Sequence, residues 1–150
     1  MKLAEALNLW ADIAKRINQI SVRLENNSLV QEGEQPAEKP SVLLKELDEL
    51  IMQQEELISR INLTNAKTVS EGKTITELIA HKDALRSKIN VLRGFLNEAS
   101  RNVMRALRSE IKILSTVDVA AMRKTVDGLE KDFRETDAKI QSLNWTTELL

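Results

Sequence analysis

Four segments of this chain repeat apolar residues at heptad spacing, and this pattern constrains the fold more than any other feature. Within each segment an apolar side chain returns after three or four positions, which places it on one face of an α-helix of about 3.6 residues per turn. The four ladders consist of Leu3, Leu7, Trp10, Ala14, Ile17 and Leu24; of Leu43, Leu47, Leu50, Leu57 and Ile61; of Ile75, Leu78, Lys82, Leu85, Ile89, Leu92 and Leu96; and of Val119, Met122, Val126, Leu129, Phe133, Thr136, Ile140 and Leu143. Apolar neighbours such as Ile13 and Ile20 widen the stripes beyond the seam of a two-stranded coiled coil. The pattern predicts an all-α fold, a bundle of four long helices with long connections.

Residues that favour helix starts precede three of these ladders. Ser41 predicts an N-cap for the second helix. Thr74 and Glu77 have the spacing of a capping box ahead of the third, and Ser115 with Asp118 forms a weaker version ahead of the fourth. These signals support the division of the chain into separate helices.

Acidic residues also stand four positions before basic residues on the predicted helix faces. The pairs are Glu56 with Arg60, Glu130 with Arg134, and Glu135 with Lys139. Each such pair stabilises a helix by about 0.2–0.5 kcal/mol when it forms. They favour helix formation and indicate no function.

The connection at residues 26–40 is long, because two neighbouring antiparallel helices need a loop of only about 2–8 residues. We expect an ordered connection in which Leu29 and Val30 are anchored against Ile111–Leu114, of the same subunit or of a neighbour. The alternative is an acidic linker that stays in solvent. The partly β-branched residues in both regions also allow a short two-stranded ribbon that pairs residues 29–31 with 111–115.

Composition limits the classes of protein to which the chain can belong. A length of 150 residues is typical of one domain, so a single helical domain at 1–150 is predicted. With no cysteine and one histidine, the chain can form no disulfide and no metal site with two histidines of the same copy. The longest apolar run, Val119–Met122, is far shorter than the roughly 20 residues that span a bilayer. The opening residues lack the apolar region of a signal peptide, which predicts a cytoplasmic protein.

The sequence contains no pattern typical of an active site. The four glycines are isolated from one another, so no glycine-rich phosphate loop is present. We therefore expect no cofactor and no small-molecule substrate, and a non-enzymatic function is favoured. His81 lies four residues after Glu77 and could provide two ligands to a metal shared across an oligomer interface. The alternative is a histidine in solvent.

Two groups of polar residues are candidate binding sites. Arg60, Asn62 and Asn65 lie together near the end of the second helix, where they could form a polar pocket with Arg60 as an anion clamp, or cap the helix end. The second group is basic and would form one stripe if residues 100–114 are helical. Its members are Arg101, Arg105, Arg108 and Lys112.

Charge is distributed unevenly along the chain, although its formal net charge is only −1. The segment Lys45–Glu56 is acidic, with five acids against one base, whereas Lys82–Arg108 has seven bases against two acids. The basic stripe could therefore meet the acidic second helix of the same or a neighbouring subunit. The alternatives are a membrane surface or a nucleic acid, to which basic amphipathic helices also bind.

Five short stretches occur in the order of a known family. They are MKLAEALN at the start, VQEGEQPAE at 30–38, RINLTNA at 60–66, SEIKILSTVDV at 109–119 and LNWTTELL at the end. Together they resemble a family of uncharacterised bacterial helical proteins, some of which carry the label septicolysin. The resemblance covers essentially the whole chain. The label implies a pore-forming toxin, and the family implies no catalytic residue.

Taken together, these features predict a non-enzymatic, homo-oligomeric helical scaffold or partner-binding protein. A membrane-active or toxin-like protein is the first alternative, and it predicts leakage of anionic vesicles. A nucleic-acid binder is the second, and its binding would weaken steeply with salt. Aromatic residues that could stack on bases are few, at 3% of the chain.

Overall fold

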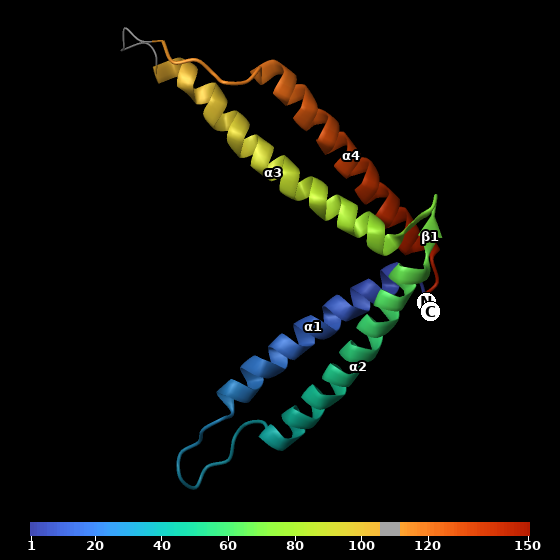
Figure 1. Cartoon of the computed structure of the whole chain (residues 1–150). Helices are drawn as coiled ribbons and strands as arrows, with labels where there is room; N and C mark the ends of the chain where they lie inside the picture. The colour runs from blue at the N-terminus through green and yellow to red at the C-terminus, as the bar shows by residue number, and fades with distance from the viewer. Residues whose placement is uncertain (106–111) are drawn as a thin grey trace. The chain divides into compact units, whose positions relative to one another are not determined.

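The computed structural model describes the backbone of residues 1–105 and 112–150, with the side chains of 1–101 and 112–150. Four long helices make up most of this part of the chain (Figure 1). They are α1 (Leu3–Asn26), α2 (Pro40–Lys67), α3 (Ile75–Arg105) and α4 (Val119–Thr146). The predicted all-α fold with four long helices is confirmed.

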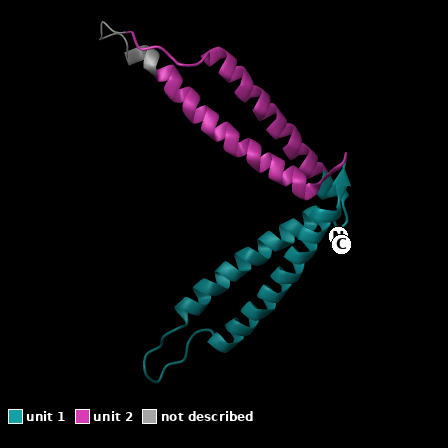
Figure 2. Ribbon diagram, in the orientation of Figure 1, with its two compact units in different colours: residues 1–70, 143–150 teal, residues 71–142 magenta. Residues whose placement is uncertain are grey.

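The chain divides into two compact units (Figure 2). The first unit comprises Met1–Ser70 and Leu143–Leu150, and in it α1 and α2 lie side by side. The second unit comprises Glu71–Ser142, with α3 and most of α4. Helix α4 continues without a break from the second unit into the first, because Leu143–Thr146 are its last residues.

A short two-stranded ribbon follows α2. Strand β1 (Val69–Ser70) pairs with β2 (Lys73–Thr74), and the two residues between them have positive φ, 51° at Glu71 and 80° at Gly72. This is the backbone of a tight hairpin turn, and glycine adopts it without strain. The ribbon predicted at 29–31 with 111–115 is wrong, since 29–31 and 112–115 form no strand; residue 111 lies outside the described residues. A local hairpin closes a far shorter loop than that distant pairing would.

Three of the four predicted ladders form the buried faces of their helices. The buried ladder members are Leu43, Leu50, Leu57 and Ile61 in α2, Ile75, Leu78, Leu85 and Ile89 in α3, and Val126, Thr136 and Ile140 in α4. In α1 the buried face is rotated, because Ala6 and Ile13 are buried in place of the ladder residues Leu7 and Ala14, and Ile20 is buried beside Ser21, where the ladder has a gap. The rotation exchanges Leu7 for a smaller alanine, but it brings Ile13 and Ile20 into the buried face and removes their apolar surface from water.

Helix starts agree with the sequence at one position and differ at two. The capping box of α3 is confirmed: Glu77 N–H donates to Thr74 Oγ1 at 3.1 Å, and Thr74 N–H donates to Glu77 Oε2 at 2.7 Å. Helix α2 begins at Pro40 with Lys39 as its N-cap, two residues before the predicted N-cap Ser41, because proline at the first position has no N–H to satisfy. Asp118 itself caps α4, accepting the N–H of Ala121 at 3.1 Å.

The connection between α1 and α2 is held by polar residues. Anchoring of Leu29 and Val30 within the same copy is wrong, since Leu29 is 88% exposed and Val30 is 50% exposed. Instead, Asn27 Oδ1 accepts the backbone N–H of Glu38 at 2.9 Å. The Glu38 carboxylate in turn accepts the Nε–H of Arg23 at 3.0 Å. These bonds fasten the end of the connection to the last turn of α1.

Candidate functional site

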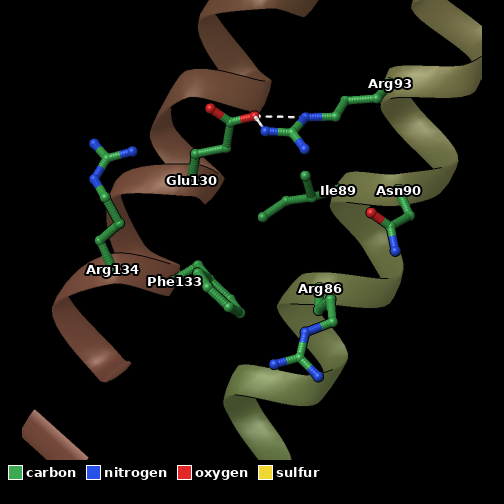
Figure 3. Close-up of a pocket in the computed structure, with 7 residues that line it drawn as sticks. All are labelled: Arg86, Ile89, Asn90, Arg93, Glu130, Phe133 and Arg134. Atoms are coloured by element: carbon green, nitrogen blue, oxygen red, sulfur yellow. Dashed lines mark hydrogen bonds and ion pairs between the residues drawn. The ribbon is translucent and has the colours of Figure 1, made fainter. Parts of the chain in front are cut away.

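An open groove lies between α3 and α4 in the second unit. Its volume is about 240 Å³. Seven residues line it: Arg86, Ile89, Asn90 and Arg93 of α3, and Glu130, Phe133 and Arg134 of α4 (Figure 3). Because the two helices supply opposite walls, the groove depends on the packing of the whole unit.

The floor of the groove is apolar. Ile89 and Phe133 point toward one another from the two helices (Figure 3). Both occupy heptad positions of their ladders, so the same spacing that builds the helix faces also builds this floor. Ile89 is only 5% exposed, whereas Phe133 is half-buried.

The rim of the groove is basic. Arg86 and Arg93 lie seven residues apart on α3, and Arg134 lies on α4. Glu130 is the one acid of the lining, so the groove has a net formal charge of +2. The Arg93 Nε–H donates to Glu130 Oε1 at 2.7 Å.

The other two arginines keep donors available. The Arg86 guanidinium lies 5.5 Å from the centre of the Phe133 ring, a cation–π contact, and 3.4 Å from the Asp83 carboxylate. Arg134 has no ion pair within the described residues, because Glu130, its predicted partner, pairs with Arg93 across the groove. Guanidinium groups stay protonated and donate up to five hydrogen bonds each. The rim is therefore suited to carboxylates.

This arrangement suits the binding of an acidic group beside an apolar one. Its arginines stay protonated near neutral pH, and Glu130, the one carboxylate of the lining, accepts a hydrogen bond from Arg93. An apolar floor with arginines on the rim is complementary to an apolar side chain flanked by acidic ones.

The basic stripe predicted from the sequence does not form one helical face. Arg101 is exposed near the end of α3 and pairs with Glu98 of the same helix at 3.0 Å. Helix α3 ends at Arg105, and the exposed Lys112 lies outside any helix. The Arg105 side chain and Arg108 lie outside the described residues. Since residues 112–114 are not helical, the condition for a single stripe, a helix over 100–114, is not met at Lys112.

Of the three residues of the predicted polar pocket, Arg60 is hydrogen-bonded to another part of the chain. The Arg60 Nε–H donates to the backbone oxygen of Leu150 at 2.8 Å, and Thr64 Oγ1 accepts the Leu150 N–H at 3.0 Å. Asn62 is exposed, and Asn65 is half-buried. Arg60 thus binds a backbone carbonyl rather than its predicted partner Glu56.

Three of the family-like stretches meet at this place in the first unit. Leu3 N–H donates to Thr147 O, and Leu149 N–H donates to Met1 O, both at 2.9 Å. Lys2 Nζ lies 2.6 Å from a Glu148 carboxylate oxygen. The hydrogen bond from Lys2, joined by that from the N-terminal ammonium, lowers the pKa of Glu148. The stretches at 1–8, 60–66 and 143–150 therefore share a structural role, to fasten the two ends of the sequence to α2.

His81 and Glu77 have separate partners. Glu77 caps α3 through Thr74, and the backbone hydrogen bond from Thr74 lowers the pKa of its carboxyl. His81 Nε2 lies 3.2 Å from Asp132 Oδ2 on α4. Within residues 1–101 and 112–150, no three acidic or histidine side chains gather as metal ligands would.

Besides the groove between α3 and α4, a second candidate binding surface lies on α2. It was not predicted from the sequence. Leu44, Asp48, Ile51 and Glu55 share one helix face at spacings of four, three and four residues, and we call them the α2 stripe. Leu44 is 50% exposed and Ile51 is 44% exposed. Neither acid has an ion pair in the described part of the chain. The heptad spacing of 44 and 51 beside the buried ladder could have revealed this stripe.

The fold and these two surfaces define an all-α protein whose exposed features suit recognition. The chain belongs to a family of unknown function, DUF6847, whose family model matches residues 10–149. A search of curated proteins found no significant match.

A solved structure also resembles the chain throughout. It is the crystal structure of a functionally unknown conserved protein from Corynebacterium diphtheriae, with 39% sequence identity and a TM-score of 0.89. The match covers 100% of this chain and 99% of that one. Both findings support the expectation of an uncharacterised bacterial family, and neither concerns the septicolysin label. No helix in the described ranges has the length and apolar character needed to cross a membrane.

Proposed function

We propose that this protein is a non-enzymatic helical scaffold that assembles with copies of itself. The observation that carries the proposal is the α2 stripe, where Leu44 and Ile51 are half exposed beside two acids that form no ion pair with any described residue. Single exposed apolar residues are common on soluble proteins, but apolar residues one heptad apart form a ridge that can pack against another helix. Burying this ridge in an interface would remove its apolar surface from water.

The charge of the two units supports the same proposal. The first unit has twelve acidic and eight basic residues, and its net formal charge is −4. The second unit has eleven acidic and fourteen basic residues, and its net formal charge is +3. The two values sum to the −1 of the whole chain. The acidic first unit of one copy therefore attracts the basic second unit of another copy.

Multi-angle light scattering over a range of protein concentrations tests this proposal. We expect the measured mass to rise above the 17.0 kDa of one chain as concentration increases. The double variant Leu44→Gln/Ile51→Gln should shift the mass toward that of one chain, because it removes the apolar ridge.

The matched control is Val42→Gln/Leu63→Gln. It also replaces two exposed apolar residues of α2, but on a different face. The control should assemble like the wild type. A wild-type mass of one chain at every concentration would overturn the proposal.

A further inference from the structure

The α2 stripe and the groove between α3 and α4 match each other in chemistry. The stripe has an apolar centre, Ile51, with Asp48 and Glu55 on either side of it along the helix. The groove has an apolar floor that includes Ile89, with Arg86 and Arg93 on either side along α3 (Figure 3). One surface is acidic and the other basic, and each places its charges around an apolar side chain.

The two surfaces also match in length. Asp48 and Glu55 are seven residues apart on α2, and Arg86 and Arg93 are seven residues apart on α3. Seven residues of α-helix rise about 10.5 Å, so the two acids and the two arginines have the same axial separation. A helix that lies along α3 can therefore bring both acids to arginines at the same time.

The groove is large enough for side chains of such a helix to enter it. The groove has a volume of about 240 Å³, whereas a helix with its side chains is about 10–12 Å across, so side chains can enter it and a whole helix cannot. The helix backbone would stay above the rim, where the guanidinium groups are exposed. Arg93 can donate to a second carboxylate while it binds Glu130, because a guanidinium has five N–H donors.

We infer that the α2 stripe of one copy docks into the α3–α4 groove of a second copy. Ile51 packs on the floor of Ile89 and Phe133, and Asp48 and Glu55 pair with the arginines of the rim. This inference rests on the proposed function and names the two surfaces that assembly uses. Since the two surfaces differ, the contact is heterologous. The first copy in such an assembly keeps a free stripe or groove and the last copy keeps the other, so further copies can add until a ring closes.

A charge exchange tests this contact. The first variant, Asp48→Arg/Glu55→Arg, places basic side chains on the stripe. The second, Arg86→Glu/Arg134→Glu, makes the groove acidic and leaves the Arg93–Glu130 pair intact. Each variant alone should assemble about tenfold or more weakly than the wild type, because like charges then face each other. An equimolar mixture should recover part of the assembly, because the basic stripe of one variant meets a groove of net negative charge in the other, where only Arg93 remains basic.

The matched control is Glu49→Arg/Glu56→Arg. It makes the same charge change at the same spacing on another exposed face of α2, and it should assemble like the wild type. Circular dichroism of each variant checks that the helices are retained. In 1 M salt the wild type should assemble less, because the Debye length falls to about 3 Å and the attraction between exposed charges is screened.

The outcomes separate this inference from the proposed function. If the wild type assembles but both charge variants assemble equally well, the contact is wrong and the scaffold proposal stands. If the mixture of the two variants does not recover assembly, the pairing of stripe with groove is wrong. If the wild type remains a single chain throughout, both proposals fail.

Discussion

At the scale of single residues, burial and pairing separate positions that look alike in the sequence. Ile89 and Val91 are both β-branched residues of α3, two positions apart, yet Ile89 is 5% exposed and Val91 is 71% exposed. The heptad ladder predicted this difference, because it included Ile89 and not Val91.

Replacing Ile89 with alanine should therefore destabilise the protein. We expect the free energy of unfolding to fall by about 2–5 kcal/mol, because the change removes buried methyl groups and leaves a cavity. Urea denaturation followed by circular dichroism measures the difference. The control Val91→Ala should change the stability by less than about 0.5 kcal/mol. Equal effects of the two substitutions would show that the assigned face of α3 is wrong.

Glu38 gives a prediction of pH dependence. The hydrogen bond from Arg23 lowers the pKa of its carboxyl below the ordinary 4.5. A carboxyl with a lowered pKa in the folded state stabilises the fold above its unfolded pKa, and this contribution disappears as pH falls through the folded pKa. The variant Glu38→Gln should thus be less stable than the wild type at pH 7, with a difference that shrinks below about pH 4.5.

Thermal denaturation of both proteins at a series of pH values tests this. Glu34→Gln serves as the control, because Glu34 is an exposed acid of the same connection with no ion pair among the described residues. A difference between wild type and Glu38→Gln that is constant down to pH 3 would contradict the prediction.

At the scale of helices, the predicted pairs within one helix give way to partners from elsewhere. Glu130 pairs with Arg93 of α3, and the Lys139 ammonium pairs with Glu71 instead of Glu135. Arg60 binds Leu150 rather than Glu56. An exposed pair within a helix contributes only a few tenths of a kcal/mol, so a partner that also joins two segments can displace it.

Thr64 shows how α2 holds the end of the sequence. Its side chain is 0% exposed, and its hydroxyl donates to Arg60 O at 2.8 Å while it accepts the Leu150 N–H. The variant Thr64→Val keeps the shape but leaves the N–H of Leu150 without its acceptor. We expect the stability to fall by about 1–3 kcal/mol.

Thr125→Val is the control for this prediction, because the exposed Thr125 hydroxyl also donates to a carbonyl four residues earlier, that of Ala121. It should change little. Hydrogen exchange would further locate the effect of Thr64→Val, since the amides of Thr147–Leu150 should lose protection. Unchanged exchange at these amides would show that Thr64 does not hold them.

At the scale of the whole molecule, one helix belongs to both compact units. The sequence predicts a single domain at 1–150, and helix α4 passes from the second unit into the first. A helix shared in this way couples the two units, because its backbone hydrogen bonds continue across the boundary between residues 142 and 143. We therefore expect one cooperative transition on heating at low protein concentration.

The positions of the tryptophans make this prediction easy to test. Trp10 and Trp145 are the two tryptophans of the chain, and both belong to the first unit. Their fluorescence reports on that unit, whereas circular dichroism at 222 nm reports on all the helices. Coincident transitions by the two methods would support one domain. A fluorescence transition separated from the circular dichroism transition would show that the units unfold independently.

The sequence by itself determined the features that depend on local spacing. Heptad ladders, the capping box at Thr74 and the distribution of charge specified four helices and most of their buried faces, because helix geometry relates residues three and four positions apart. Only the tertiary structure decided which α1 residues are buried, how polar residues hold the connection at Asn27 and Glu38, and where the arginines of α3 meet those of α4. These features join residues far apart in the chain, and their geometry depends on the relative rotation of packed helices, which local spacing leaves open.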